Sequence, residues 1–577
     1  MENVAIARLL GEIADLLEIR ADNPFKIRAY RNAAYTIAAE PSRVAELDDA
    51  ALKGLPGIGK DLAQRIREIV ETGDTPYRQE LAAAFPATLL ELLRLQGVGP
   101  KTVKRLFEEL GVASLDALEA AAKDGRIRAM KGMGVRKEAL ILKAIEERRR
   151  YAGRHLSAAV EEVARPLVAQ LSADFPAAEF VAVGSLRRGA ETCGDLDILA
   201  VGAPAEVMDR FTAQPGVVRV LGRGDTKASV LLFNGIQADL RLVEPASRGA
   251  ALQYFTGSKS HNIALRDRAL GRGLRLNEYN LTQIDSGAVV AGDTEEGIYA
   301  ALGLDFVPPE LRENRGEMEA AERHALPALV QRSDLRGDLH SHTTATDGKD
   351  DIETMARAAR AAGLEYLGVT DHSQALAMAG GLDEAAALAH ATRIRATNGR
   401  IEGITLLAGI ECDIRLDGTL DLADDCLAQL DVVIASIHSG FTLEPEALTD
   451  RLLRAIENPW VDALGHPTGR LLLRREPLRF DLDRVLKAAI AQGIAIEINS
   501  LPDRLDVGDT VARRALDLGA TLIVSSDSHS AQSFGVLDWG IRVAKRAWAT
   551  SGNILNTRPL AELQKSLRRN RQGRQTR

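Results

Sequence analysis

Residues 334–567 alternate apolar, strand-like runs with helical segments, and this alternation constrains the fold more than any other feature of the chain. Six of the runs stop at or just before a histidine or an acidic residue. These residues are His340, His372, Glu411, His438, His466 and Asp527. A regular alternation of this kind predicts βα repeats arranged as a barrel. Because the carboxyl ends of barrel strands meet at one face, we expect the six positions to converge there.

A metal-binding cluster is the interpretation that we favour for these strand ends. A single histidine at a strand end is more often a packing residue, but that explanation would have to hold six times in one domain. Imidazole and carboxylate ligands together suit Mn²⁺, Zn²⁺ or Fe²⁺. His390 has no histidine or carboxylate partner nearby in the sequence, so we expect a packing role for it and also for His324.

A second group of acidic residues lies upstream, in residues 184–199. This stretch predicts a strand, a Gly-Ser turn, a short basic helix and a second strand that carries Asp195 and Asp197. Alternation along a strand places both carboxylates on one face. A third predicted strand, residues 236–241, could add Asp239. Close carboxylates repel each other unless a cation lies between them, so we expect divalent metal ions here.

The turn before these carboxylates can bind a phosphate. Gly184 and Ser185 offer backbone N–H groups, and Arg187 and Arg188 add charged donors. Three carboxylates, a phosphate cradle and two Mg²⁺ ions describe nucleotidyl transfer by two-metal chemistry. The alternative is a surface turn with solvated aspartates.

A further block of residues supports the same site. Tyr254 and Phe255 precede a glycine turn, where an aromatic pair can press on a sugar. Asn262 and Arg266 lie one helical turn apart, so their side chains share a face. On structural grounds alone, the two aromatic residues could instead belong to the core.

Residues 1–150 have helical periodicity interrupted by three Gly-x-Gly turns, each of which precedes a helix. Free N–H groups at such a helix start can bind a DNA phosphate without reading bases. A tight helix–helix turn is the alternative for any single copy, but three copies favour helix-hairpin-helix modules. The predicted DNA-binding residues are Gly57, Gly59, Lys60, Gly97, Gly99, Lys101, Gly132 and Gly134.

The net charge of −8 over 577 residues is unusual for a DNA-binding protein, but it is unevenly distributed. Residues 1–150 hold 25 Lys and Arg against 23 Asp and Glu, whereas residues 334–567 hold 24 against 34. The acidity therefore lies where metal ligands could use it and does not oppose DNA binding upstream.

Cysteine content and hydropathy favour a cytoplasmic protein. The three cysteines, Cys193, Cys412 and Cys426, are scattered and odd in number, which fits a reducing compartment. No apolar run approaches the roughly 18 residues of a membrane span. Arg8 and Glu12 interrupt any apolar core of a signal peptide, so we expect none.

The order of the motifs in residues 1–315 resembles the family X DNA polymerases. That order is Gly-Ser-x-Arg-Arg-Gly, Gly-Asp-x-Asp, a third Asp, and Tyr-Phe-Thr-Gly-Ser followed by Asn and Arg. The resemblance implies that Asp195, Asp197 and Asp239 are catalytic and hold two Mg²⁺ or Mn²⁺ ions. It implies a nucleotide-binding set of Gly184, Ser185, Arg188, Gly194, Tyr254, Phe255, Gly257, Asn262 and Arg266.

One position departs from the family pattern. Members with deoxyribose-phosphate lyase activity carry a nucleophilic lysine six residues after the second glycine of the first hairpin. That position is Arg65 in this chain, and Lys60 lies in the wrong register. Arginine stays protonated and cannot form a Schiff base, so we expect no strong lyase activity.

The histidine-rich region resembles the polymerase and histidinol phosphatase (PHP) domain, a distorted (β/α)7 barrel. The matching pattern is His-x-His, Asp, His, Glu, His, His, Asp-x-His. The resemblance implies about three divalent metals (Mn²⁺, Zn²⁺ or Fe²⁺), with Glu411 bridging two of them, and hydrolysis at phosphorus. Its nine implied ligands are His340, His342, Asp347, His372, Glu411, His438, His466, Asp527 and His529.

The expected protein is therefore multidomain, with an all-α helix-hairpin-helix N-terminal region, an α+β nucleotidyltransferase palm and thumb, and a C-terminal PHP barrel. The expected domains are 1–80 (8-kDa-like), 81–153 (fingers-like), 154–244 (palm), 245–311 (thumb-like), 312–333 (an exposed, charged linker), 334–567 (PHP) and 568–577 (basic tail).

The whole order of modules resembles the bacterial family X DNA polymerases. The resemblance implies DNA-directed gap filling in repair, with 3′-5′ exonuclease or 3′-end processing by the PHP domain. The implied partners are gapped or primer–template DNA and deoxynucleoside triphosphates, with no membrane. We expect a monomer that acts at the bacterial nucleoid. The alternatives are a PHP domain that acts as a small-molecule phosphatase and a non-catalytic DNA-end scaffold.

Overall fold

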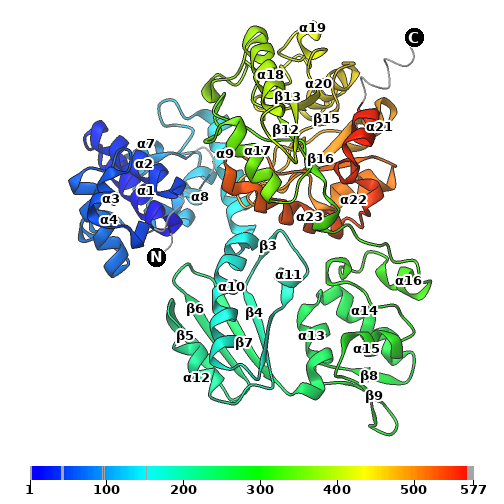
Figure 1. Ribbon diagram of the computed structural model, residues 1–577. Helices are drawn as coiled ribbons and strands as arrows, with labels where there is room; N and C mark the ends of the chain where they lie inside the picture. The colour runs from blue at the N-terminus through cyan, green and yellow to red at the C-terminus, as the bar shows by residue number, and fades with distance from the viewer. Residues whose placement is uncertain are drawn as a thin grey trace. The chain divides into compact units, whose positions relative to one another are not determined.

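The computed structural model contains two compact units, residues 1–152 and 153–577 (Figure 1). It describes residues 3–40, 44–86, 88–93, 95, 98–150 and 153–567. Two predictions lie outside the described residues: the DNA contact of Gly97 and the basic tail at 568–577. No helix in the described ranges combines the length and the apolar character of a membrane span.

The described part of the first unit is helical, as expected. Its helices are α1 (Asn3–Arg20), α2 (Pro24–Ala39), α3 (Asp49–Gly54), α4 (Lys60–Thr72), α5 (Pro76–Ala83), α6 (Leu89–Leu92), α7 (Pro100–Leu110), α8 (Leu115–Lys123) and α9 (Gly134–Arg150). Helix α5 shows why they start where they do, because Thr75 caps the N–H of Tyr77 and Pro76 occupies the first position. One apolar cluster gathers α1, α2 and α4, and a second gathers α7, α8 and α9.

A five-stranded mixed sheet begins the second unit. The elements of this region are β1 (His155–Leu156), α10 (Ser157–Asp174), β2 (Glu179–Ala182), α11 (Gly184–Arg187), β3 (Thr192–Cys193), β4 (Leu196–Val201), α12 (Val207–Thr212), β5 (Val217–Arg223), β6 (Lys227–Leu232) and β7 (Gln237–Val243). Strands β1 and β3 pair with each other as a separate two-stranded sheet. The strand order is β2-β4-β7-β6-β5, and the central pair β4 and β7 is parallel. Along β4, Ile198 packs in the cluster formed with α10, whereas Leu199 packs in a different cluster with Leu252.

A mostly helical segment follows the sheet. Its elements are α13 (Arg248–Thr256), α14 (Lys259–Leu270), β8 (Leu274–Leu276), β9 (Leu281–Gln283), β10 (Val289–Ala291) and α15 (Glu295–Ala301). The buried side chains of Leu265, Tyr299 and Leu311 belong to one apolar cluster, which joins α14 to α15 and to the chain beyond it.

The expected exposed linker at 312–333 is wrong for its first half. Arg312 and Glu317 are fully buried, and α16 (Glu317–Glu322) packs Met318 into the same apolar cluster. Arg312 Nη1 donates to Glu295 at 2.6 Å, and the imidazole of His261 bonds Glu317 at 2.7 Å. The charged residues that predicted solvent exposure are instead hydrogen-bonded to residues that are remote in sequence.

Seven parallel strands form the C-terminal barrel in sequential order, from β11 to β17. The strands are β11 (Gly337–Asp338), β12 (Tyr366–Val369), β13 (Thr405–Asp413), β14 (Val432–Ser436), β15 (Ala463–Leu464), β16 (Ala495–Asn499) and β17 (Leu522–Ser525). A parallel bridge between Ser341 and Ser528 brings the first strand back to the last. The predicted PHP-type barrel is thus confirmed, with β16 as a strand in addition to the six that end at candidate ligands.

Helices cover the outside of the barrel (Figure 1). They are α17 (Ile352–Ala361), α18 (Glu384–Asn398), α19 (Asp424–Leu427), α20 (Pro445–Glu457), α21 (Leu482–Gln492), α22 (Asp509–Asp517), α23 (Leu537–Arg546) and α24 (Leu560–Ser566). Helix α18 packs Ile394 against Leu406 and Ala408 in the main apolar cluster of the barrel. The strand interior is apolar because both faces of a parallel sheet are buried.

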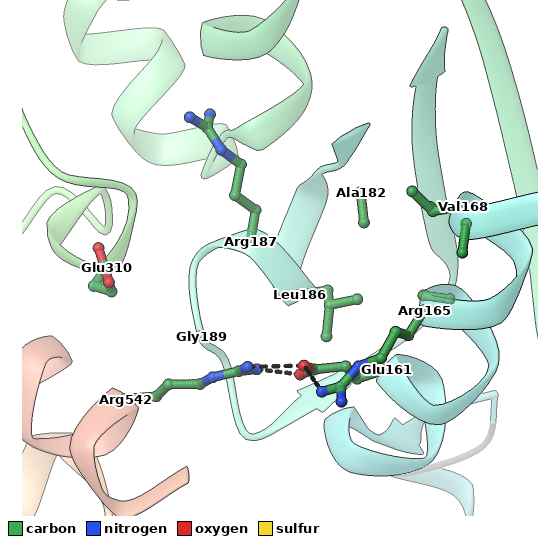
Figure 2. A pocket seen from close by; sticks show the side chains of 11 residues that line it. Glu161, Arg165, Val168, Ala182, Leu186, Arg187, Gly189, Glu310 and Arg542 are labelled. Carbon is green, nitrogen blue, oxygen red and sulfur yellow. Dashed lines mark hydrogen bonds and ion pairs between the residues drawn. The ribbon is translucent and has the colours of Figure 1, made fainter. Parts of the chain in front are cut away.

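Charged side chains join the sheet domain to the barrel within the second unit. Figure 2 shows Arg542 of α23 reaching across to the carboxylate of Glu161 on α10, with Nη2 donating at 3.0 Å. The pair lines a cavity of about 510 Å³, and Val168 and Leu186 also line it. Nearby, Arg470 of the barrel pairs with Glu191, at 3.1 Å through Nη1.

Candidate active sites

Two carboxylates lie side by side on the mixed sheet, and a third lies just before one of their strands. Asp197 on β4 lies directly opposite Asp239 on the parallel strand β7. Asp195 lies in the bend that precedes β4, and its charge acts on Asp197. Asp239 is only 6% exposed, Asp197 is half-buried and Asp195 is exposed. The structure thus pairs Asp197 with Asp239 and places Asp195 near enough for its charge to act on Asp197.

The electrostatics of this group are those of crowded carboxylates. Burial, and then the charges of Asp195 and Asp239, raise the pKa of Asp197 to about 6. Burial also acts to raise the pKa of Asp239, but hydrogen bonds from Lys227, Gln237 and Ser229 outweigh it and lower that pKa. Lys227 Nζ lies 2.7 Å from Asp239 Oδ2 and supplies a positive charge to the group. Three oxygen donors of this kind fit Mg²⁺ or Mn²⁺.

The turn before β4 has the backbone conformation that the phosphate cradle requires. Gly184 has a φ of +66°, and a Cβ there would lie 3.1 Å from Asp197 Oδ2. Glycine therefore serves both the left-handed backbone and the close approach of the carboxylate. Gly184 and Ser185 are the first two residues of helix α11, so both lie in its first turn.

The two arginines of the turn behave differently from each other. Arg187 donates to Glu295 at 3.0 and 2.6 Å and to Thr256 Oγ1 at 2.6 Å. The expectation that Arg187 contacts a phosphate is wrong, because its guanidinium cross-links α11 to α13 and α15. Arg188 donates to Glu313 at 3.0 Å and to the carbonyl of Thr256 at 2.6 Å.

The expected sugar-binding aromatic residues lie at the end of α13. Tyr254 and Phe255 contact each other edge to face with centroids 5.1 Å apart, and Arg241 lies 4.7 Å above the Phe255 ring. Both aromatic residues are half-buried. Asn262 Nδ2 donates to the carbonyl of Tyr254 at 2.7 Å, which ties the two predicted groups together. Arg266 is exposed one turn further along α14.

Two of the predicted glycines lie at backbone positions next to these groups. Gly257 ends α13 with a φ of +70°, and a Cβ there would lie 3.2 Å from Arg188 Nη1. Gly194 is exposed immediately before Asp195. The nucleotide-binding roles of the whole set remain predictions.

The nine residues predicted as PHP ligands converge at the carboxyl ends of the barrel strands. Their ligand atoms form four overlapping groups in which all atoms lie within 4.8 Å of one another. The groups are His342-Asp347-His372-His529, His340-His466-Asp527, His340-His342-Glu411 and His372-Glu411-His438.

Glu411 occupies the centre of this cluster. Its Oε1 lies 2.8 Å from His466 Nε2 and 3.3 Å from His438 Nε2. Its Oε2 lies 2.8 Å from His372 Nδ1 and 3.4 Å from His340 Nε2. Oε2 also lies 3.7 Å from His342 Nε2. Two oxygens that face different sets of imidazoles are the arrangement expected of a bridging carboxylate.

Several buried ligand atoms of the cluster lie near other ligand atoms but make no hydrogen bond with suitable geometry. They are Nε2 of His340, both ring nitrogens of His342, Nδ1 of His372, Nδ1 of His438 and Oε2 of Glu411. Buried polar groups rarely remain unpaired, so these atoms fit a site for divalent metal ions. Burial, with the charges of His529 and His372, lowers the pKa of His342 to about 4, so its imidazole is neutral and able to bind a metal.

A supporting residue that sequence reasoning did not assign lies on β16. Glu497 is fully buried, accepts a hydrogen bond from His340 Nδ1 at 2.7 Å and accepts the backbone N–H of His466 at 2.6 Å. A carboxylate on the far nitrogen of a histidine directs the other nitrogen to the metal. The acidic position in the strand-like run 494–499 was the available signal.

The expectation that His390 has no carboxylate partner is wrong. His390 Nε2 lies 2.8 Å from Oδ2 of Asp371, the residue that precedes the ligand His372. Thr343 Oγ1 donates to the same oxygen at 2.8 Å. The partner is 19 residues away in sequence, which hid the pair. His324 is exposed and bonds Asp305 at 2.8 Å.

The helix-hairpin-helix turns of the first unit have helix starts that a phosphate could approach. Gly59 and Gly99 are the N-cap residues of α4 and α7, and Gly134 begins α9. Lys60 and Lys101 are exposed at the first turns. At the position where the lyase members have a lysine, Arg65 pairs with Glu68 at 3.0 Å and covers the Tyr77 ring at 5.1 Å.

Comparison with family models matches four parts of the chain. Residues 1–75 match a helix-hairpin-helix domain, residues 89–147 a SAM-like helix-hairpin-helix tandem, residues 251–313 the DNA polymerase beta thumb and residues 338–501 the PHP domain.

The chain is similar to curated proteins with two kinds of name. DNA polymerase/3′-5′ exonuclease PolX of Bacillus subtilis (strain 168) is 36% identical, over 99% of this chain and 100% of that protein. Probable phosphatases of Thermoanaerobacter sp. (strain X514) and Shewanella sp. (strain MR-4) are 33% and 30% identical. These cover 38% and 39% of this chain, and 89% of each phosphatase.

Proposed function

We infer the function from one premise: the chain belongs to the PolX family of DNA polymerases that carry a 3′-5′ exonuclease. The chain is accordingly a DNA-directed DNA polymerase that fills short gaps, and its PHP domain is a 3′-5′ exodeoxyribonuclease. The observation that carries this conclusion is the likeness over 99% of the chain, which includes both ligand clusters. We propose that the protein acts as a monomer on gapped or primer–template DNA during repair in the bacterial cytoplasm.

In the polymerase half, we propose that Asp195, Asp197 and Asp239 hold two Mg²⁺ or Mn²⁺ ions. Such ions neutralise the attacking and leaving oxygens of nucleotidyl transfer. The protein would contribute position: the parallel pairing of β4 and β7 keeps two of the carboxylates opposite each other. The turn at Gly184 would present its N–H groups to the triphosphate. Arg188, held by Glu313, would add a positive charge.

For the nucleoside of the incoming triphosphate, we propose the end of α13 as the binding surface. The half-buried edge of Tyr254 and Phe255 would lie against the sugar and disfavour a ribose hydroxyl. Asn262, fixed to the carbonyl of Tyr254, would lie near the new base pair with Arg266. Fixed groups of this kind lower the cost of ordering substrate before reaction.

In the exonuclease half, we propose that the nine strand-end residues hold about three Mn²⁺, Zn²⁺ or Fe²⁺ ions. Bound ions of this kind polarise a phosphodiester and activate water. Glu411 would bridge two of them, because its two oxygens face different imidazoles. Glu497 would keep Nε2 of His340 aimed at the cluster.

We propose that the hairpins of the first unit bind the DNA backbone. Backbone N–H groups at the starts of α4 and α7, with Lys60 and Lys101, suit phosphates and carry no base specificity. Binding should therefore weaken steeply with salt. Arg65 leaves the first hairpin without the lysine that a Schiff base needs, so lyase activity is not part of the proposal.

The likeness of the barrel to probable phosphatases makes phosphomonoester hydrolysis the second candidate for this domain. It accounts for under two fifths of the chain and for none of the upstream modules. A barrel of this kind would release phosphate from a phosphorylated metabolite faster than a nucleotide from a recessed duplex. Comparing both substrates in one assay distinguishes the two functions.

The two activities should separate by mutation. Replacing both Asp195 and Asp197 by Ala should lower primer extension by more than about 100-fold, since metal ligation supplies several kcal/mol, and should leave nucleotide release intact. Replacing His340 and His342 by Ala should have the opposite effect. Both activities are measured on one gapped, 3′-labelled duplex with added Mg²⁺ or Mn²⁺.

The exposed His324→Ala variant serves as the control and should retain both activities. Circular dichroism melts establish that each variant is folded. If either double variant lost both activities while folded, the assignment of separate sites would be wrong.

A further inference from the structure

A cavity of about 440 Å³ opens directly beside the metal-binding cluster, where the loops after β13 and β14 meet. One wall is His438, whose Nε2 lies 3.3 Å from Glu411 Oε1. A group attached to a phosphodiester at the cluster would therefore lie next to the cavity.

Part of the cavity lining is apolar. Leu376 and Leu416 contribute to it, and Leu416 is 62% exposed although it is a large apolar residue. Leu416 lies in a short hairpin that is closed by a bridge between Ile414 and Leu420. Arg415 Nη2 donates to the carbonyl of Asp421 at 2.9 Å and fixes the base of that hairpin.

The backbone after β14 is shaped to receive Leu416. Gly440 has a φ of +70°, and a Cβ there would lie 2.7 Å from Leu416 Cδ2 and 2.9 Å from Arg451 Nη1. Arg451 in turn donates to the carbonyl of Ser439 at 2.8 Å. The hairpin is thus held against the loop from both sides, so the exposed leucine is presented on a fixed support.

The cavity is lined by charges of both signs. Asp413 and Asp417 are acidic, and Arg415 is cationic, with its Nη2 on the backbone carbonyl of Asp421. A flat, neutral and largely apolar group would enter, because it removes the face of Leu416 from water.

We propose that this cavity is the binding site for the nucleobase of the 3′-terminal nucleotide that the barrel removes. The proposal rests on the exonuclease function proposed above. When the scissile phosphorus lies at the cluster, the terminal nucleoside is one bond away from it and the cavity adjoins the cluster at His438. Leu416 and Leu376 form the apolar surface against which the base stacks, and the enzyme thereby selects ends that carry a base.

The test compares two oligonucleotides that are identical except for the last residue, which is either a normal nucleotide or an abasic tetrahydrofuran nucleotide. The wild-type protein should release the normal nucleotide with a kcat/KM about tenfold higher, as expected for the loss of one stacked base. Leu416→Ala should lower kcat/KM about tenfold for the normal end and leave the abasic end unchanged. Met378→Ala, fully exposed on the neighbouring loop and outside the cavity, should behave as wild type.

A binding measurement that needs no turnover uses metal-free protein in EDTA with a 3′-terminal 2-aminopurine. Wild-type protein should change the fluorescence of that base, and Leu416→Trp, which fills the cavity, should abolish the change while total DNA binding persists.

Three results would decide against the site. They are equal rates on both ends by the wild-type protein, equal losses on both ends in Leu416→Ala, or an unchanged 2-aminopurine signal in Leu416→Trp. Absence of nucleotide release from every DNA by a folded, metal-loaded wild-type protein would instead overturn the exonuclease function, and the subsite with it.

Discussion

At the scale of single residues, the structure shows side chains held in states that cost stability. Asp197 is the clearest case, because burial and two neighbouring carboxylates raise its pKa to about 6. An unfolded aspartate has a pKa of about 3.9. Between pH 4 and pH 6 the folded protein keeps a proton that the unfolded chain has released, so stability falls as pH rises through this window.

Asp197→Asn should therefore stabilise the metal-free protein. At pH 7.5 the variant should gain on the order of 2 kcal/mol in free energy of unfolding, since the charge that is expensive to bury is gone. The gain should shrink toward zero as the pH is lowered to about 4. Urea denaturation in EDTA at several pH values measures both effects.

The matched control is Asp225→Asn, at an exposed turn between β5 and β6, which should change stability by less than about 0.5 kcal/mol. Adding Mg²⁺ should stabilise the wild-type protein more than the Asp197→Asn variant. A variant that is no more stable than wild type at pH 7.5 would contradict the proposed like-charge crowding.

At the scale of elements, the barrel strands position the residues at their carboxyl ends, and a neighbouring strand can contribute to that positioning. β16 contributes none of the nine predicted ligands, yet its Glu497 contacts two of them. The carboxylate accepts from His340 Nδ1 and from the backbone of His466, so one strand positions ligands from β11 and β15. A strand can therefore support a metal site without contributing a metal ligand to it.

Glu497→Gln should weaken the site without removing a ligand. The amide lacks the charge that fixes the orientation and proton position of His340, and such changes typically cost 10- to 100-fold in metal affinity. We expect a higher Mn²⁺ concentration for half-maximal nucleotide release and unchanged primer extension. Glu365→Gln, exposed beside Arg336 at the other end of the barrel, should alter neither quantity. An unchanged Mn²⁺ requirement in Glu497→Gln would rule out the positioning role.

At the scale of the whole molecule, a buried charge network joins the sheet domain to the barrel within residues 153–577. Arg546 of α23 is 8% exposed and donates to Asp509 at 3.0 Å, to Glu313 at 2.9 Å and to the carbonyl of Arg188 at 3.0 Å. The last contact reaches the turn of the proposed triphosphate site. Arg546 thus links the two catalytic halves through hydrogen bonds and ion pairs.

Arg546→Ala should lower the free energy of unfolding by on the order of 2 kcal/mol, because Asp509 and Glu313 each lose one charged hydrogen-bond donor and keep only Arg315 and Arg188. It should also separate the unfolding of the barrel from that of the sheet domain, which calorimetry would record as a second transition. Arg514→Ala, an exposed arginine on α22 paired with Asp483, should cost less than about 1 kcal/mol. A single unshifted transition in Arg546→Ala would show that this network does not couple the halves.

Local patterns were sufficient for much of the fold. Apolar runs with strand composition, helical periodicity and glycine turns predicted the helical first unit and the strand–helix barrel, because each depends on spacing over a few residues. Partnerships between remote side chains were not accessible in this way. The neighbours of Arg187, Arg312 and His390 in the sequence predicted a phosphate contact, an exposed linker and a histidine without a carboxylate partner. In the fold, Arg187 and Arg312 bond Glu295, and His390 bonds Asp371.

The sequence alone determined which chemical groups the chain can offer: two carboxylates two residues apart at the start of one strand, and imidazoles and acids at the ends of barrel strands. Only the tertiary structure decided which of them meet, because convergence depends on how strands far apart in sequence are ordered in a sheet. It also decided which charges are paired, since a buried charge is stable only beside a partner that packing supplies. That packing places Asp239 beside Asp197 on the sheet and the carboxylate of Glu497 against Nδ1 of His340.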